Sequence, residues 1–133
     1  NLPNGILVLG WISLEKKQYQ EAIEYHNRLP GSVYYQMHLG QTYVKAGQRE
    51  KALVLWEELE QRADNDDVNP CYMGMMAAYL GFTDQAFELL NKASHKKSYP
   101  VIYVDVYPCS ERIRNDPRYV EMMENMNLPY KRR

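Results

Sequence analysis

Apolar positions in the first hundred residues recur every three or four residues, the spacing of helices with one buried face. Ile6, Leu9, Ile12 and Ser13 follow this spacing near the start, and Pro30-Gly31 interrupts the pattern and indicates a turn. The pattern predicts three pairs of helices. Their expected ranges are 4–16 with 19–29, 33–46 with 49–62, and 69–80 with 83–94.

One pair of small residues occurs three times with the same internal spacing, a glycine followed twelve positions later by an alanine. The set is Gly10, Gly40 and Gly74 with Ala22, Ala52 and Ala86. Successive copies are offset by 30 and 34 residues. A repeat of this length is typical of stacked helical hairpins, in which small residues let two helices approach closely. The predicted copies cover about 4–30, 33–63 and 69–96.

Turn and cap residues support these ranges. Gly47 and Gly81 stand between the helices of the second and third pairs, where a positive φ costs glycine little. Asn69-Pro70 is a typical helix start, with Asn as N-cap and Pro at the first helical position. The acidic run 64–67 is expected to be a polar loop.

The periodicity changes after Ser98, which divides the chain into residues 1–98 and a closing segment, 99–133. Alternating β-forming residues predict an extended packed segment over about 99–112. Asp116-Pro117 is expected to begin a last helix, 117–126, which caps the third pair. Its apolar side carries Met122, Met123 and Met126, and its polar back carries Glu121 and Glu124.

The repeated pattern resembles the tetratricopeptide repeat, a family with Leu-Gly and Tyr on one helix and Ala and an aromatic residue on the next. The second copy matches best, with Leu39-Gly40, Tyr43, Gly47, Ala52 and Trp56. The resemblance implies an all-α fold, a right-handed solenoid of three hairpins with a C-terminal capping segment and helix.

The closing segment resembles the end of tetratricopeptide arrays in bacterial multidomain regulators. The matching residues are Arg114-Asn115-Asp116-Pro117-Arg118-Tyr119, followed by Leu128-Pro129. Tyr107-Pro108 stands where that family usually has an earlier Asp-Pro. The resemblance implies a place in signalling or transcription regulation, within a larger protein.

Composition narrows the classes of partner. The 133 residues carry a net charge of −1, which argues against direct binding of nucleic acid. The basic ends Lys96-Lys97 and Lys131-Arg132-Arg133 are expected to be solvated. The apolar run from Ile6 to Ile12 is too short to span a membrane. Cys71 and Cys109 have no metal-like spacing, and two packed free thiols indicate a cytoplasmic protein.

The chain contains no enzyme motif, so a non-catalytic protein without cofactor or metal is expected. His26, His38 and His95 are widely separated and form no ligand motif. The acidic run 64–67 lacks the glycine and the closing glutamate of a calcium loop.

The resemblance implies that the first helix of each pair lines a concave groove that binds a protein or peptide. Packing against neighbouring helices explains each position about as well, because a packed stripe and a binding stripe share one period. The expected groove residues are Leu7, Trp11, Leu14, Tyr34, Met37, Gln41, Val44, Lys45, Cys71, Met75 and Tyr79.

A secretion-type chaperone that holds an extended apolar peptide is the alternative function, and self-association into a homo-oligomer is left open. Chaperone-binding relatives hold a C-terminal carboxylate with lysines, asparagines and an arginine. None of those residue types occurs at the matching positions, Leu7, Trp11, His38, Val68 and Tyr72, so an acidic tail is not the expected ligand.

Overall fold

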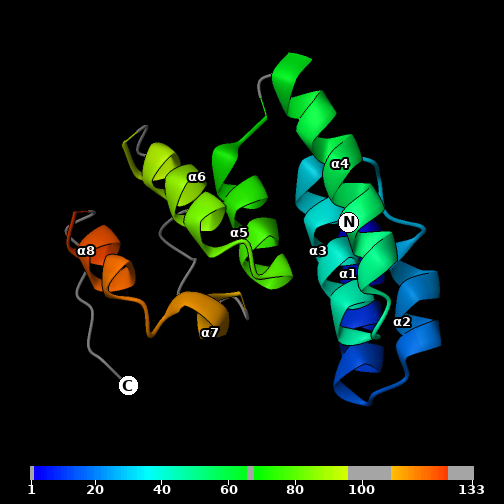
Figure 1. Cartoon of the computed structure of the whole chain (residues 1–133). Coiled ribbons are helices and arrows are strands. Elements are labelled where there is room, and N and C mark those ends of the chain that lie inside the picture. Colours follow the sequence, from blue (N-terminus) through cyan, green and yellow to red (C-terminus); the bar gives the residue numbers. More distant parts are fainter. Residues whose placement is uncertain (1, 66–67, 96–108, 126–133) are drawn as a thin grey trace. The chain divides into compact units, whose positions relative to one another are not determined.

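The computed structural model describes residues 2–65, 68–95 and 109–125, and all regular secondary structure in these ranges is helical. The all-α class predicted from the sequence is therefore confirmed. The chain divides into two compact units, residues 1–68 and 69–133 (Figure 1). This division falls between the second and third helix pairs. The boundary that the sequence predicts after Ser98 lies outside the described residues.

The first unit contains four helices, and each packs against the next one in the sequence. They are α1 (Leu2–Glu15), α2 (Tyr19–His26), α3 (Val33–Lys45) and α4 (Arg49–Asn65). In addition, α1 contacts α3. The predicted first and second pairs are therefore present, with ends that differ by a few residues. The largest differences are three residues: α2 ends at His26 rather than at 29, and α4 continues to Asn65, where a loop was predicted.

The second unit contains the third predicted pair and two shorter helices. They are α5 (Pro70–Leu80), α6 (Thr83–His95), α7 (Ser110–Ile113) and α8 (Pro117–Asn125). α5 packs on α6, α7 packs on α5, and α8 packs on α6. The sequence predicted an extended segment over about 99–112, but its last residues belong to the helix α7, so the prediction is wrong there. Residues 96–108 lie outside the described part of the chain.

The same turn joins the two helices of every pair. Lys17, Gly47 and Gly81 each have a positive φ, of 60°, 76° and 82°. In each case the amide of the following residue donates to a carbonyl oxygen five positions back, at 2.8 to 2.9 Å. These bonds are Gln18 to Ser13, Gln48 to Tyr43 and Phe82 to Ala77. This is the hydrogen bond of a glycine-type helix end, so the 30- and 34-residue offsets are repeated in the backbone.

Lys17 occupies a backbone conformation that glycine adopts at the two equivalent turns. A left-handed conformation costs a side-chain-bearing residue about 1 kcal/mol or more. We expect Lys17→Gly to raise the free energy of unfolding by up to about 1 kcal/mol and Gly47→Ala to lower it by a similar amount. Urea unfolding followed by circular dichroism measures both changes. A Lys17→Gly protein less stable than the parent would contradict this account.

Two of the repeated glycines, Gly10 and Gly74, lie where the two helices of a pair pack closely. Gly10, Gly40 and Gly74 are buried, and the three paired alanines have no exposed surface. A Cβ added at Gly10 would overlap the ring of His26, and one at Gly74 would lie 2.8 Å from the Cγ of Leu90. In both pairs the opposing side chain stands sixteen positions after the glycine. The predicted close approach is therefore confirmed at these two crossings.

The buried side of α1 differs from the stripe that the sequence pattern indicated. Leu7 and Leu14 are buried together with Gly10 and Ser13. Leu9 and Ile12, which shared the predicted helical spacing, are exposed. The reason is that α1 is apolar on all sides, so that periodicity alone cannot choose between its faces.

The helix α8 begins with the predicted cap. The amide of Arg118 donates to Asp116 Oδ1 at 3.0 Å, and Pro117 occupies the first helical position. At α5, the Asn69 side chain likewise accepts from the Cys71 amide at 2.9 Å. On α8, Met122 and Met123 are buried while Glu121 and Glu124 are exposed, as expected of a covering helix. Met126 lies outside the described residues.

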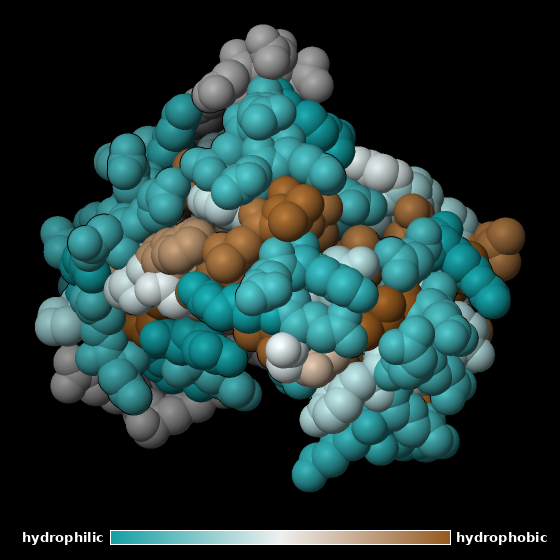
Figure 2. Space-filling model, turned by 45° about the vertical axis from the view of Figure 1, so that its right-hand side comes forward, coloured by the Kyte–Doolittle hydropathy of each residue, from teal (hydrophilic) through white to brown (hydrophobic). Residues whose placement is uncertain are grey.

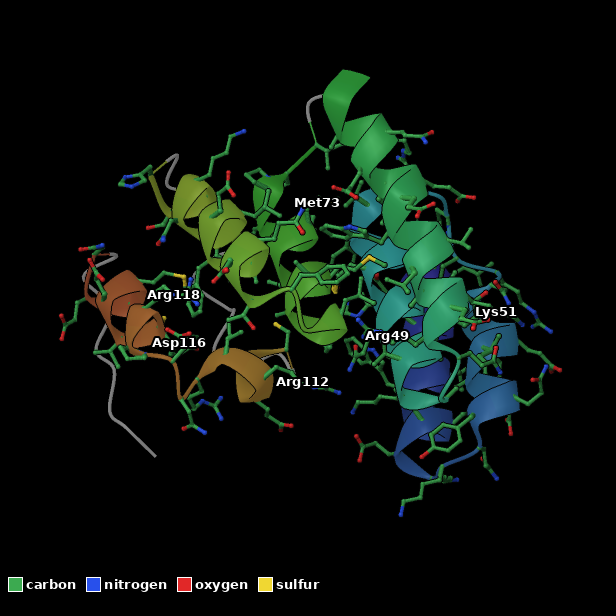
Figure 3. All side chains as sticks on the ribbon, in the orientation of Figure 1. Arg49, Lys51, Met73, Arg112, Asp116 and Arg118 are labelled. Carbon is green, nitrogen blue, oxygen red and sulfur yellow. The ribbon has the colours of Figure 1, made fainter. Side chains whose placement is uncertain are left out.

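One arginine fastens α8 to α6. The guanidinium of Arg118 lies 4.6 Å from the centre of the Phe87 ring and pairs with Asp116 at 2.9 Å and Asp84 at 2.8 Å. Figure 3 shows Asp116 and Arg118 at the start of α8. Hydrogen bonds from Arg118 lower the pKa of the Asp116 carboxyl. Arg118 thus covers an aromatic ring while both of its carboxylate partners hold it in place.

We expect Arg118→Ala to loosen α8 more than Arg118→Lys, and Arg118→Lys more than Asp84→Ala. Alanine removes the ring contact and both ion pairs, lysine loses the planar fork, and Asp84→Ala removes one exposed partner. Amide hydrogen exchange along 117–125 measures the loosening. Equal protection in Arg118→Ala and the parent would show that α8 is held by its methionines alone.

Candidate functional site

Aromatic side chains from α1 and α3 gather around His38 in the first unit. The Trp11 ring lies edge-on to the His38 ring at 5.1 Å, and the Tyr34 ring does the same at 4.9 Å. Tyr34 also meets Tyr35 edge-on at 5.0 Å. His38 is buried, whereas Trp11, Tyr34 and Tyr35 are half-buried. We call Trp11, Tyr34 and Tyr35 the aromatic surface.

A hydrogen bond between helices holds this surface from one side. The Tyr35 hydroxyl donates to Asn4 Oδ1 at 2.9 Å, which joins α3 to α1. The α1 and α3 sides of the aromatic surface are therefore tied together by a polar contact as well as by the ring packing at His38.

A second histidine organises the core beneath the aromatic surface. His26 Nε2 lies 3.1 Å from the Leu7 carbonyl oxygen, and His26 Nδ1 lies 2.7 Å from Thr42 Oγ1. A carbonyl oxygen only accepts, so the neutral ring carries its proton on Nε2 and its Nδ1 accepts the proton of the Thr42 hydroxyl. The Thr42 hydroxyl also lies 3.1 Å from the His38 carbonyl oxygen, and its single proton goes to the nearer acceptor, His26 Nδ1. This chain of contacts connects α1, α2 and α3. Gly10 gives the His26 ring the room it needs.

Both histidines favour the neutral form. Burial lowers the pKa of His38 to about 3. The nearby His26 lowers this pKa further, and a side-chain hydrogen bond with Gln41 opposes the shift. Burial also lowers the pKa of His26, against the raising effect of its bond to the Leu7 carbonyl. At neutral pH the core of the first unit therefore contains two uncharged imidazoles, which suits packing rather than proton transfer.

The structure divides the predicted groove residues into surface and interior positions. In the first unit, Trp11, Tyr34 and Val44 are half-buried and Lys45 is exposed. The remaining predicted residues of that unit are buried, namely Leu7, Leu14, Met37 and Gln41. The buried side chains support the surface from below. Only Trp11, Tyr34, Val44 and Lys45 of this set are open to a ligand.

In the second unit all three predicted groove residues, Cys71, Met75 and Tyr79, are buried. Burial raises the pKa of the Cys71 thiol and of the Cys109 thiol to about 12. Both thiols are therefore protonated and poorly nucleophilic at neutral pH. The two cysteines are free and packed, as the sequence indicated.

A surface that the sequence did not single out lies between α3 and α4. A shallow depression there is lined by Tyr43, Leu55 and the exposed Val54, with Lys51 and Glu58 among its polar residues. The Lys51 ammonium lies 5.9 Å from the centre of the Tyr43 ring, and Figure 3 labels Lys51 on α4. In the sequence, only Val54 could have indicated this face. It is apolar, whereas the residues three and four positions before and after it, which flank it on the helix surface, are all charged.

Within 2–65, 68–95 and 109–125, no group of three or more His, Cys, Asp or Glu side chains could hold a metal ion. None of the helices in these ranges is both long and apolar enough to cross a membrane. On the face drawn in Figure 2, hydrophilic side chains cover most of the surface and apolar residues show between them.

Comparison with known proteins found no matching family model, no matching curated protein and no matching solved structure. The tetratricopeptide resemblance therefore rests on the residues and spacings of this chain.

Proposed function

We propose that the chain is a non-catalytic interaction module that binds a peptide or a partner segment on the aromatic surface of its first unit. The observation that carries the proposal is the pair of edge-on contacts that fix Trp11 and Tyr34 against the buried His38. Rings held in this way lose little conformational freedom when a ligand binds. They also present both apolar area and a polar edge.

The surroundings of the aromatic surface favour a peptide over a charged polymer. Val44 and Lys45 continue the surface along α3, and Asn4 supplies an exposed amide on α1. One cation and one amide beside three aromatic rings suit a mostly apolar segment with a few backbone hydrogen bonds. A nucleic-acid partner would require several more basic side chains here.

We also propose the finer architecture, a right-handed solenoid of three tetratricopeptide hairpins closed by α7 and α8. The matching turns at Lys17, Gly47 and Gly81 support this architecture, and so do the small residues at the helix crossings. The proposed setting within a bacterial regulator rests on the resemblance of 114–119. The Asp116–Arg118 contact serves folding in any such protein and does not by itself favour a regulator.

A binding experiment tests the proposed site. Peptides selected from a random display library against this chain should lose affinity by about tenfold or more in Tyr34→Ala, because a buried aromatic anchor dominates such contacts. Tyr19→Ala, at an exposed tyrosine on α2, is the matched control and should bind as the parent does. Isothermal titration measures each affinity, with circular dichroism as a check of folding.

Selected peptides that bind equally well to the parent, Tyr34→Ala and Trp11→Ala would place the binding site elsewhere. Peptide affinity is also measured for Lys45→Ala. Lys45 is exposed and outside the core, so a change in affinity there does not depend on the packing of a ring.

A further inference from the structure

The helix α1 has an apolar face that no other described helix of the first unit covers. Leu2 is 78% exposed, Val8 46%, Leu9 45% and Ile12 46%. No charged residue precedes Glu15 in the sequence. The opposite side of α1 is also apolar and buries Leu7 and Leu14. Helices that are apolar all round are normally buried all round. The exposed face of α1 is therefore a candidate docking surface.

The spacing on this face is that of paired helices. Leu2, Gly5, Leu9 and Ile12 follow one another at intervals of three, four and three residues, the seam of a two-helix contact. Lys16, four residues after Ile12, lies beyond this seam and ends the apolar run. A Cβ built at Gly5 would meet nothing within 4 Å, so Gly5 leaves an open gap one turn from Leu9.

The chain itself shows what kind of element covers such a face. Thirty residues after Leu9 and Ile12, the repeat places Leu39 and Thr42 on α3, and both are buried. A helix lies over this side of α3, because His26 of α2 reaches Thr42 at 2.7 Å and α2 packs on α3. The same face of the first helix is thus covered by a helix in one pair and bare in another.

We propose that the exposed face of α1 is a dimer interface, on which the α1 of a second copy of this chain packs in the antiparallel direction. About a twofold axis near the middle of the seam, Leu9 of each copy enters the gap at Gly5 of the other. Leu2 of each copy then meets Ile12. The face is self-complementary in this arrangement, which is what a twofold interface requires.

The charge distribution favours a second copy over a different partner. A seam without a single charged side chain repels no copy of itself and offers no charge by which to select another protein. The interface is small, with four partly exposed aliphatic side chains per copy. We therefore expect a dissociation constant in the range of about 1 µM to about 1 mM, which is typical of weak, transient contacts.

Sedimentation equilibrium of the full chain across this concentration range tests the proposal. The parent should pass from monomer to dimer, and Leu9→Glu should weaken the dimer by about tenfold or more, because each copy then buries an unpaired carboxylate. Val54→Glu, at an exposed apolar position on α4, is the matched control and should dimerise as the parent does. Glutamate is a good helix former, so both variants should fold, and circular dichroism checks this.

Cross-linking tests the direction. In the antiparallel pair a Leu2→Cys/Ile12→Cys protein should form an intermolecular disulfide under air oxidation far more readily than Ile12→Cys alone, since Cys71 and Cys109 are buried. A parent that stays monomeric throughout would overturn the proposal. So would a dimer that survives Leu9→Glu, a dimer lost equally in Val54→Glu, or efficient cross-linking through position 12 alone.

Discussion

Replacing Gly10 by alanine should destabilise the first unit by about 3 kcal/mol, although alanine is the better helix former. The new methyl group would occupy the position of the His26 ring, which therefore has to move. Moving the ring breaks its contacts with the Leu7 carbonyl and the Thr42 hydroxyl. Buried polar groups left without partners cost about 1–3 kcal/mol, in addition to the strain of overpacking.

A matched control lies on the same helix. Gly5 is exposed, and an added Cβ there meets nothing, so Gly5→Ala should raise the free energy of unfolding by up to about 1 kcal/mol through helix propensity. Urea titrations of dilute protein measure both variants. The double variant Gly10→Ala/His26→Ala should be clearly more stable than the sum of the two single changes predicts, because the overlap is then absent. Additive losses would show that Gly10 does not act through His26.

The first unit should lose stability as the pH falls from 7 to 5. The unfolded chain protonates His38 near pH 6.5, whereas the folded chain resists protonation down to a pKa of about 3. The unfolded state therefore binds more protons between these two values, and stability decreases as the pH falls through this window. Between pH 7 and 5 the expected loss from His38 is about 2 kcal/mol. His26, whose pKa is also lowered, acts in the same direction.

His38→Phe isolates this effect, since it keeps a ring between Trp11 and Tyr34 but cannot titrate. Its loss of stability between pH 7 and 5 should be smaller than that of the parent by about 2 kcal/mol. Carboxyl groups titrate in both proteins, so the difference between the two pH profiles belongs to the imidazole. Parallel profiles would mean that His38 is already protonated, or accessible to protons, in the folded chain.

Features set by local sequence could be predicted well. The caps at Asn69 and Asp116 depend on adjacent residues, and so do the positive φ angles at Gly47 and Gly81. The small residues at the helix crossings also followed from spacing alone. Lys17 adopts the same left-handed turn without glycine, which shows that the packing of the pair can impose a backbone conformation that the residue itself disfavours.

Features set by packing between helices could not be predicted. Periodicity could not tell which side of the apolar α1 is buried, so Leu7 and Leu14 were expected at a groove and lie in the core. The role of Arg118 depends on Phe87, thirty-one positions earlier, and no local pattern joins the two. Of the expected groove residues, Trp11, Tyr34, Val44 and Lys45 lie at the surface. The sequence could not reveal that the rings of Trp11 and Tyr34 rest on His38.

The dependence of Phe87 on Arg118 has a consequence for synthesis of the protein. In the first unit each helix packs on the one just before it, so each pair can close soon after it leaves the ribosome. The Phe87 ring, in contrast, acquires its cationic cover only when Arg118 emerges. At ordinary rates of translation that interval is roughly 2–6 s. During this interval the nascent second unit exposes the side of the Phe87 ring that Arg118 later covers. A chaperone or an aggregation partner would bind most readily at this stage of synthesis.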